Sequence, residues 1–232
     1  MLLFLCVAAI FNLNGRVLGA GDTVPANYLP FSLIREFDFD LDEFSFLYER
    51  EIPFHLLERD GHIVSAYHPW AAVLALPVYI LPVLSGISPQ SPLVRIGRLE
   101  KLSASLIAAL SVAVLLLALQ RMTDVKVAWL VAVTFALGTS TFSTSSQALW
   151  HHGPSQLFLC VMIYCLVRGV EQPRFVALAG LSLASAVICR PLNILIMLPM
   201  VAYILHKQRS QFIVFFLATL PPLILFMAYK AA

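Results

Sequence analysis

A single carboxylate stands where the first apolar stretch of this chain ends. Asp22 lies between Gly21 and Thr23, shortly after the opening stretch MLLFLCVAAIF. At such a boundary the dielectric constant falls, and a carboxylate held there is suited to take a proton from a hydroxyl as a general base. Asp is also favoured at turns and helix N-caps for local hydrogen bonding alone. The residues by themselves leave both interpretations of Asp22 open.

A second group of acids follows in the stretch DFDLDEF. Asp38, Asp40 and Asp42 occupy alternate positions, with Glu43 beside the last of them. If this stretch is extended, three carboxylates share one face and offer oxygen ligands to Mg²⁺ or Mn²⁺. The stretch lacks the glycine and the twelve-residue spacing of an EF-hand. Solvated surface acids are therefore the alternative to a metal site.

Tyr67 and His68 open the second apolar stretch, in the sequence SAYHPWAAVLALP. An aromatic belt at a membrane surface accounts for Tyr67 and Trp70 without any chemistry. His68 precedes a proline at the water boundary, where an imidazole could bind a phosphate. Tyr67 and His68 are both candidate substrate-binding residues.

Paired histidines lie in the middle of a long uncharged stretch. His151 and His152 are in residues 127–167, which are 41 consecutive positions without Asp, Glu, Lys or Arg. Histidine is costly in hydrocarbon, so the pair indicates a polar cavity within the membrane. A surface hairpin turn broken by Gly153 and Pro154 is the alternative. Adjacent residues rarely converge on one ion, which argues against a zinc site here.

Arg190, in ICRPLN, is the only charged residue between Arg174 and Lys207. An arginine between apolar stretches either snorkels to an interface or pairs with an anion. In a cavity, its planar fork suits a phosphate better than a lysine does. Arg190 is therefore a candidate phosphate ligand.

The composition is that of a membrane protein. Hydrophobic residues make up 60% of the chain and charged residues 12%, with a mean hydropathy of +0.86. Ordinary soluble domains carry about 25% charged residues. The net charge of +2 is not gathered into a basic patch, which excludes nucleic acid as an expected partner. The four cysteines lie in apolar runs without metal-ligand spacing and are expected to be packing residues.

We predict an all-α fold, a polytopic transmembrane helical bundle, as a single membrane domain over residues 1–232. Residues 1–11 are shorter than the about 20 residues that a span needs, and we interpret them as a clipped first transmembrane helix. A signal-peptide h-region is the alternative, although the stretch lacks a basic n-region. Residues 12–68 form an outer loop with ten of the 13 acids, and residues 69–232 hold the remaining helices. In the loop we expect short interfacial helices around residues 30–47 and 53–59; a solvated charged loop is the alternative.

The positive-inside rule gives the predicted orientation. If the linkers with Arg121, Arg168 and Lys207 face the cytoplasm, the WHHGP and RPLN tips and the acidic loop all lie outside. Counting every apolar stretch as a span then puts residues 95–101 and 121–126 on opposite sides. One element between residues 70 and 126 must therefore be re-entrant or broken, or the tips face the cytoplasm.

The order of these pieces resembles the N-terminal half of a GT-C superfamily glycosyltransferase. The stretches that carry the resemblance are GDTVPANYLP, DFDLDEF, SAYHPWAAVLALPVYI, SQALWHHGPSQLFLCVMIYCLVRG and ICRPLNILIMLP. Protein O-mannosyltransferases, aminoarabinose transferases and Rgt-like lipopolysaccharide sugar transferases are the most similar members. The resemblance covers nearly the whole chain, through layout and short motifs.

The resemblance implies a multi-pass enzyme of the plasma (inner) membrane that takes a sugar from a polyprenyl-phosphate donor in the lipid bilayer. Asp22 matches the catalytic Asp that helps deprotonate an acceptor hydroxyl, which attacks the anomeric carbon with inversion. By analogy, Arg190 and the histidines would neutralise the lipid phosphate, and the DFDLDEF acids would orient the sugar or a divalent cation (Mg²⁺ or Mn²⁺). The acceptor would be a glycan, a lipid or a protein.

Two other classes remain open on sequence grounds. A transporter or flippase for a lipid-linked saccharide would line its pathway with Arg190 and the histidines, although no convincing inverted repeat is visible. A non-catalytic scaffold would use the acidic loop as a partner surface. Family members are usually longer, so we expect a fragment of a longer protein, inactive alone.

Overall fold

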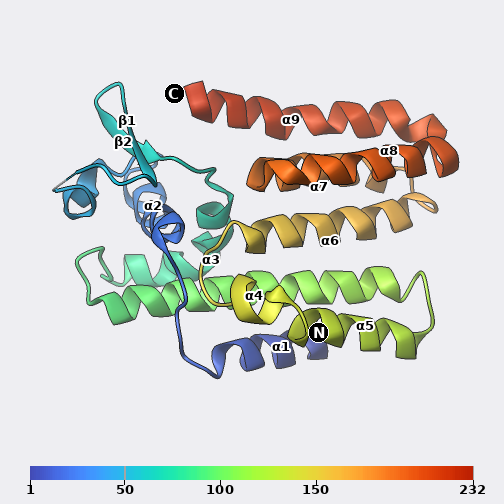
Figure 1. Ribbon diagram of the computed structural model, residues 1–232, viewed down its shortest axis with the longest axis horizontal. Coiled ribbons are helices and arrows are strands. Elements are labelled where there is room, and N and C mark those ends of the chain that lie inside the picture. Colours follow the sequence, from blue (N-terminus) through green and yellow to red (C-terminus); the bar gives the residue numbers. More distant parts are fainter. Residues whose placement is uncertain (50, 232) are drawn as a thin grey trace.

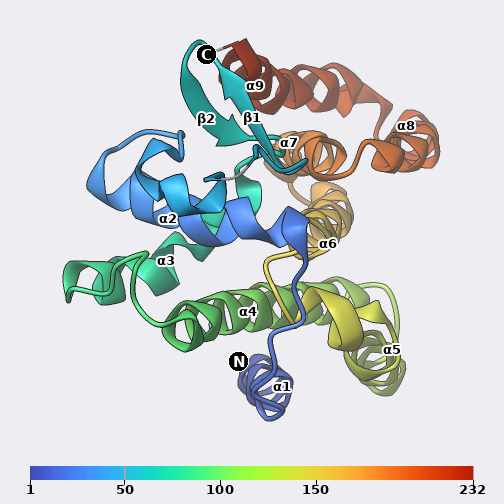
Figure 2. The same ribbon diagram turned by 60° about the vertical axis from the view of Figure 1, so that its left-hand side comes forward.

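The computed structural model describes residues 1–49 and 51–231 and, at positions 93 and 94, the backbone alone (Figure 1). The chain is mostly helical, which confirms the predicted fold class in its coarse form. Most of the helices run side by side along the long axis of the molecule, as Figure 1 and Figure 2 show. They are α1 (Leu2–Asn12), α4 (Leu93–Leu119), α5 (Val125–Leu137), α6 (His152–Gly169), α7 (Arg174–Cys189), α8 (Ile194–Lys207) and α9 (Phe212–Ala231).

These helices follow the apolar stretches of the sequence and pack through small residues. Ala128, Ala132 and Ala136 recur every four residues and are buried along one face of α5, in one cluster with Ala108 and Ala109 of α4. Small side chains let two helix backbones approach closely, which is the usual packing of helices in membranes. A second close approach joins α7 to α9, where a methyl group on Gly180 would overlap the Phe215 carbonyl oxygen.

The linkers between these helices gather at one end of the bundle. Arg121 donates to Glu171 at 3.0 Å, which joins the α4–α5 linker to the α6–α7 linker. The amide of Gln208, before α9, donates to the carbonyl of Leu166 at 3.0 Å. The linkers expected to face the cytoplasm therefore share one end, the right-hand end in Figure 1.

The acidic loop folds at the opposite end. It contains the 3₁₀ helix η1 (Gly21–Thr23), α2 (Val24–Arg35), the 3₁₀ helix η2 (Asp42–Leu47) and an antiparallel hairpin of β1 (Leu56–Arg59) and β2 (His62–Ser65). The helix expected around residues 53–59 is wrong, because 56–59 form a strand. Asp60 and Gly61 supply the positive φ angles that a tight hairpin turn requires. The fold is thus not purely α-helical.

The element α3 (Trp70–Leu84) lies at the same end as the acidic loop. It has 15 residues with Pro77 and Pro82 inside, and the ring of Tyr79 packs edge-on against Phe31 of α2 at 5.6 Å. In Figure 1, α3 and the start of α4 lie on the same side of the molecule. Of the stretches between residues 70 and 126, α3 is therefore the one that does not run the length of the bundle.

Among the described residues, two helical stretches are long and apolar enough to cross a membrane. They are Arg95–Leu119 and Arg209–Ala231. Several other helices are apolar but only 10–17 residues long. Length and composition thus support a membrane setting for two helices, and a multi-pass arrangement goes beyond this finding.

Candidate functional site

Asp22 lies in η1, in the turn that leads into α2. It does not cap α2, whose N-cap position is Thr23, and the Thr23 hydroxyl donates to the Ala20 carbonyl at 3.0 Å. Gly21 allows a close approach, since an added Cβ would lie 2.9 Å from the Phe54 ring and 3.0 Å from His55 Nδ1. The turn therefore holds a half-buried carboxylate against the chain that precedes the hairpin.

Three aromatic side chains pack against one another beside this turn, in tilted and edge-on arrangements. The ring centroid of His151 lies 4.6 Å from that of Tyr67 and 4.5 Å from that of His68. Burial raises the pKa of Tyr67, and the negative charge of Asp22 adds to the shift. Burial lowers the pKa of His151, and Asp22 opposes that effect. Tyr67 and His151 therefore lie within electrostatic reach of the Asp22 carboxylate.

His68 and His151 hold unused hydrogen-bonding groups. Within the described part of the chain, neither ring nitrogen of either residue makes a well-formed hydrogen bond, although a backbone group of Cys189 lies near His68 and one of Asp22 lies near His151. His68 is only 8% exposed, and burial, with the neighbouring His151, lowers its pKa to about 3. The imidazole of His68 is therefore neutral at physiological pH. A neutral imidazole can donate one hydrogen bond and accept another.

Arg190 reaches the same group from the turn between α7 and α8. Its guanidinium lies 2.7 Å from His152 Nδ1. Because arginine can only donate, Nδ1 must accept, so the proton of a neutral His152 is on Nε2. The turn is fixed by Asn193, whose amide donates to Ser155 Oγ and to the Ala186 carbonyl, each at 2.7 Å.

The structure thus brings together the predicted residues Asp22, Tyr67, His68, His151, His152 and Arg190. Four separate segments supply them, and the indole of Trp150 joins two of these segments by donating to the Leu18 carbonyl at 2.9 Å. Sequence reasoning missed His55, which is buried beside Gly21 and within electrostatic reach of Asp22. No local pattern marked His55, because it meets Asp22 only through the fold.

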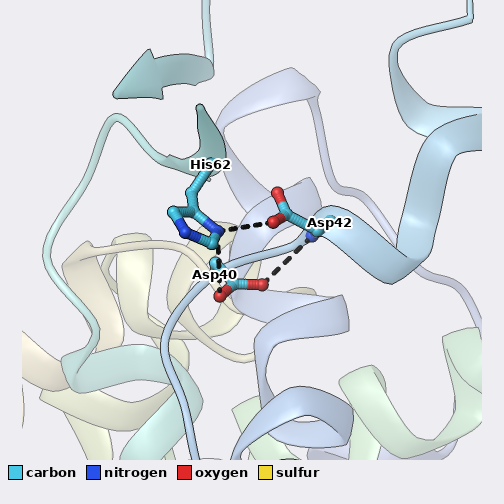
Figure 3. A group of neighbouring side chains, drawn as sticks. All are labelled: Asp40, Asp42 and His62. Carbon is cyan, nitrogen blue, oxygen red and sulfur yellow. Dashed lines mark hydrogen bonds and ion pairs between the residues drawn. The ribbon is translucent and has the colours of Figure 1, made fainter. Parts of the chain in front are cut away.

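The DFDLDEF acids form a different group, at the hairpin. Figure 3 shows His62 facing Asp40 and Asp42, and its Nδ1 lies 2.6 Å from Asp42 Oδ2 and 3.7 Å from Asp40 Oδ2. Asp42 also accepts from the Ile63 amide at 2.6 Å. Asp38 is not in this group, because residues 37–39 form a bend, with Phe37 at a positive φ, and the stretch is not extended. The expected three-carboxylate face is replaced by two carboxylates and one imidazole.

This second group has a donor set that a metal ion could use. The ligand atoms of Asp40, Asp42 and His62 all lie within 4.8 Å of one another. An imidazole beside two carboxylates fits Mn²⁺ or Zn²⁺ better than Mg²⁺, which prefers oxygen ligands alone. The His62–Asp42 hydrogen bond raises the pKa of His62, as does the negative charge of Asp42. The same contacts also serve to fasten the hairpin to η2.

An apolar cavity of about 870 Å³ lies between the hairpin, the start of α3 and the end of α9. Trp70, Val73, Leu225 and Phe226 are among its apolar lining residues. Its polar lining residues include Asp38, Asp40, Glu58, Arg59, His62 and Lys230, so the cavity borders the group around His62. The segment that carries Tyr67 and His68 contacts both places, because Ser65, Pro69 and Trp70 line the cavity and the Tyr67 ring packs on His151. Two contacts from α9 hold that segment: Tyr229 Oη donates to the Tyr67 carbonyl at 3.2 Å and Lys230 Nζ donates to the Ala66 carbonyl at 3.1 Å.

Comparison with known proteins identifies no family for this chain. No family model, curated protein or solved structure matches the chain significantly.

Proposed function

We propose that this protein is a membrane glycosyltransferase, which moves a sugar from a polyprenyl-phosphate donor to an acceptor hydroxyl. The observation that carries the proposal is the convergence of a half-buried carboxylate, neutral imidazoles and an arginine at one end of an apolar helical bundle. A carboxylate suits a proton transfer, and the arginine suits a phosphate. The order of motifs that resembles the GT-C superfamily supports the same activity.

In the proposed reaction, Asp22 takes the proton of the acceptor hydroxyl. The acceptor oxygen forms a bond to the anomeric carbon while the bond from that carbon to the phosphate oxygen breaks, with inversion. Arg190 balances the charge that develops on the departing lipid phosphate. Tyr67, His68, His151 and His152 act as hydrogen-bonding groups for the sugar hydroxyls and the phosphate, since a neutral imidazole both donates and accepts.

The donor lipid also accounts for the apolar cavity beside the site. Its walls suit an isoprenoid chain, and the segment 65–70 contributes both to the cavity and to the group around Asp22. A chain in the cavity would place its phosphate within reach of that segment. We assign the cavity to the donor chain and the Asp22 side to the sugar and the acceptor, which is a glycan, a lipid or a protein.

The proposed setting is a multi-pass protein of the plasma (inner) membrane, with the Asp22 end outside. Six Lys and Arg residues in or beside the linkers of the opposite end favour the cytoplasm there. They are Arg121, Lys126, Arg168, Arg174, Lys207 and Arg209. Since α3 stays at the outer end, the chain enters α4 from outside. Arg121 and Lys126 then lie inside, whereas Arg95, Arg98 and Lys101 lie at the outer end, against the positive-inside rule. A divalent cation remains a proposed cofactor, held by Asp40, Asp42 and His62, and of the two expected ions Mn²⁺ fits these ligands better than Mg²⁺.

Asp22→Asn tests this function. The full chain in lipid vesicles is given a radiolabelled polyprenyl-phosphate sugar and a hydroxyl acceptor, and sugar transfer and donor binding are measured separately. We expect kcat to fall about 10²- to 10⁴-fold, because the general base is lost, with donor binding nearly unchanged.

Asp60→Asn is the matched control. It makes the same chemical change in the same outer loop, at an exposed turn position whose left-handed backbone Asn also adopts. Equal transfer by wild type and Asp22→Asn would contradict the proposal. If the protein instead moves a lipid-linked saccharide across the vesicle membrane without forming a bond, it is a flippase.

A further inference from the structure

We infer that Glu100 and Lys101, adjacent residues of α4, are positioning residues. They hold the Asp22 turn and the segment before the paired histidines, residues 146–150, in place relative to each other. This inference rests on the proposed function for its catalytic consequence, but its geometry stands alone. Both side chains are only 4% exposed, inside a helix long and apolar enough to cross a membrane. An ionisable side chain in such a helix is costly, and its retention calls for a role.

Glu100 joins the Asp22 turn to the segment that leads into the paired histidines. Its Oε1 accepts from the Leu149 amide at 3.2 Å, two residues before His151. Its Oε2 accepts from the Asn27 side chain at 3.1 Å, in the first turns of α2 after Asp22. Gly19 packs on the same carboxylate, since an added Cβ would lie 3.4 Å from Oε1. One carboxylate therefore contacts two of the four chain segments of the site.

Lys101 contacts the same segment shortly before Leu149, at Ser146 and Gln147. Its Nζ donates to the Ser146 carbonyl at 3.0 Å and to Gln147 Oε1 at 2.8 Å. Asn14 also donates to Gln147 Oε1, at 2.9 Å, which connects the segment to the end of α1. Lys101 thus fixes Gln147 in the place where it meets the chain before Asp22.

The two charges act separately and do not form a pair. Neighbouring residues on a helix point about 100° apart, so their side chains diverge. Among the ion pairs of the described residues, none joins Glu100 to Lys101. Instead, each side chain forms hydrogen bonds to backbone and side-chain amide groups of these two segments. This arrangement is expected of residues that support the groups that bind substrate.

Amide hydrogen exchange tests the geometry independently of activity. In the full chain in nanodiscs, Glu100→Ala is expected to speed exchange of the Leu149 amide about tenfold or more, because its acceptor is lost. Lys101→Met should speed exchange across residues 146–150. Ser103→Ala is the matched control, since its buried hydroxyl donates to Leu99 of its own helix and is expected to leave residues 146–150 unchanged. Unchanged exchange at Leu149 in Glu100→Ala overturns the inference.

Glu100→Gln covers the case in which the alanine variant does not fold. Glutamine keeps an oxygen for the Leu149 amide, so exchange there is expected to stay within about twofold of wild type. Exchange as fast as in unstructured chain would overturn the positioning role.

Kinetics separate positioning from general stability. Glu100→Ala is expected to lower kcat about 10- to 100-fold, because small displacements of reacting groups are costly, with the donor KM changed less than about threefold. In the Asp22→Asn background the same change should cost less than about twofold, since Glu100 acts through the site that is already disabled. A full additional loss in that background contradicts the inference. If wild type transfers no sugar, the proposed function fails, and the exchange results still decide the positioning role.

Discussion

At the residue scale, the unpartnered imidazole nitrogens are the strongest pointer to a ligand. Leaving a buried polar group without a hydrogen bond costs about 1–3 kcal/mol. His68 and His151 together present four buried nitrogens without a well-formed hydrogen bond in the described part of the chain, although backbone groups of Cys189 and Asp22 lie near the two rings. A sugar offers hydroxyls that both donate and accept, and such groups would satisfy neutral imidazoles. The site therefore suits a ligand with an uncharged polar part, which would bind the imidazoles, and an anionic group, which would bind Arg190.

His62 gives a pH-dependent prediction at the same scale. The Asp42 hydrogen bond raises the folded-state pKa of His62 above its ordinary value of about 6.5. A raised pKa means that the contact stabilises the hairpin fully below the unfolded-state pKa and that this stabilisation is lost as the pH rises through the folded-state pKa.

Amide hydrogen exchange at Ile63 and Leu41 measures this effect. The Ile63 amide donates to the Asp42 carboxylate, and the Leu41 amide donates to the Ile63 carbonyl. After correction for intrinsic rates, protection should be greater at about pH 6 than at about pH 8. His62→Gln, which cannot titrate, should remove the difference. Protection that rises with pH in wild type would refute the assignment.

At the element scale, the apolar stretches predicted the helices well. The helices α5, α6, α7 and α9 follow stretches whose side chains pack on neighbouring helices, so local pattern and fold agree. The hairpin was missed because its strands are stabilised by pairing across the chain, although Asp60 and Gly61 carry a recognisable turn signal. The predicted site residues do meet, but the pairing of Arg190 with His152 and the role of Glu100 depend on packing that no spacing reveals.

The contact between α7 and α9 predicts the effect of a single methyl group. Gly180→Ala would overlap the Phe215 carbonyl oxygen, which is backbone and cannot rotate away. We expect a loss of about 1–3 kcal/mol of stability from this overpacking, despite the better helix propensity of alanine. Thermal unfolding in detergent should show a clearly lower Tm.

Gly153→Ala is the control for this experiment. Gly153 is also helical, but an added Cβ there would meet its nearest neighbour at an ordinary 3.6 Å. Its Tm should equal or exceed that of wild type. Equal stability of both variants would mean that α7 and α9 are not packed this closely.

At the scale of the whole molecule, the two ends differ in charge and in chemistry, which predicts their sidedness. Asp60 is exposed at the tip of the hairpin, and Met122 is 62% exposed in the α4–α5 linker. In a Cys6→Ala background, which removes the exposed native thiol, Asp60→Cys should react with a membrane-impermeant maleimide on intact cells. Met122→Cys should react only after the membrane is opened. Labelling of both positions from one side would disprove the proposed orientation.

The lengths of α5 and α6 set the depth at which the proposed reaction would take place. The 13 residues of α5 span only about 20 Å, whereas the hydrocarbon layer is about 30 Å thick. In the proposed orientation, α5 would therefore end below the outer boundary, and the polar segment after it would climb to His152 at the start of α6. The 18 residues of α6 span about 27 Å, so the bond to be broken would lie just beneath the outer boundary. An acceptor hydroxyl would have to reach below the lipid headgroups, so access, as well as recognition, would select what is glycosylated.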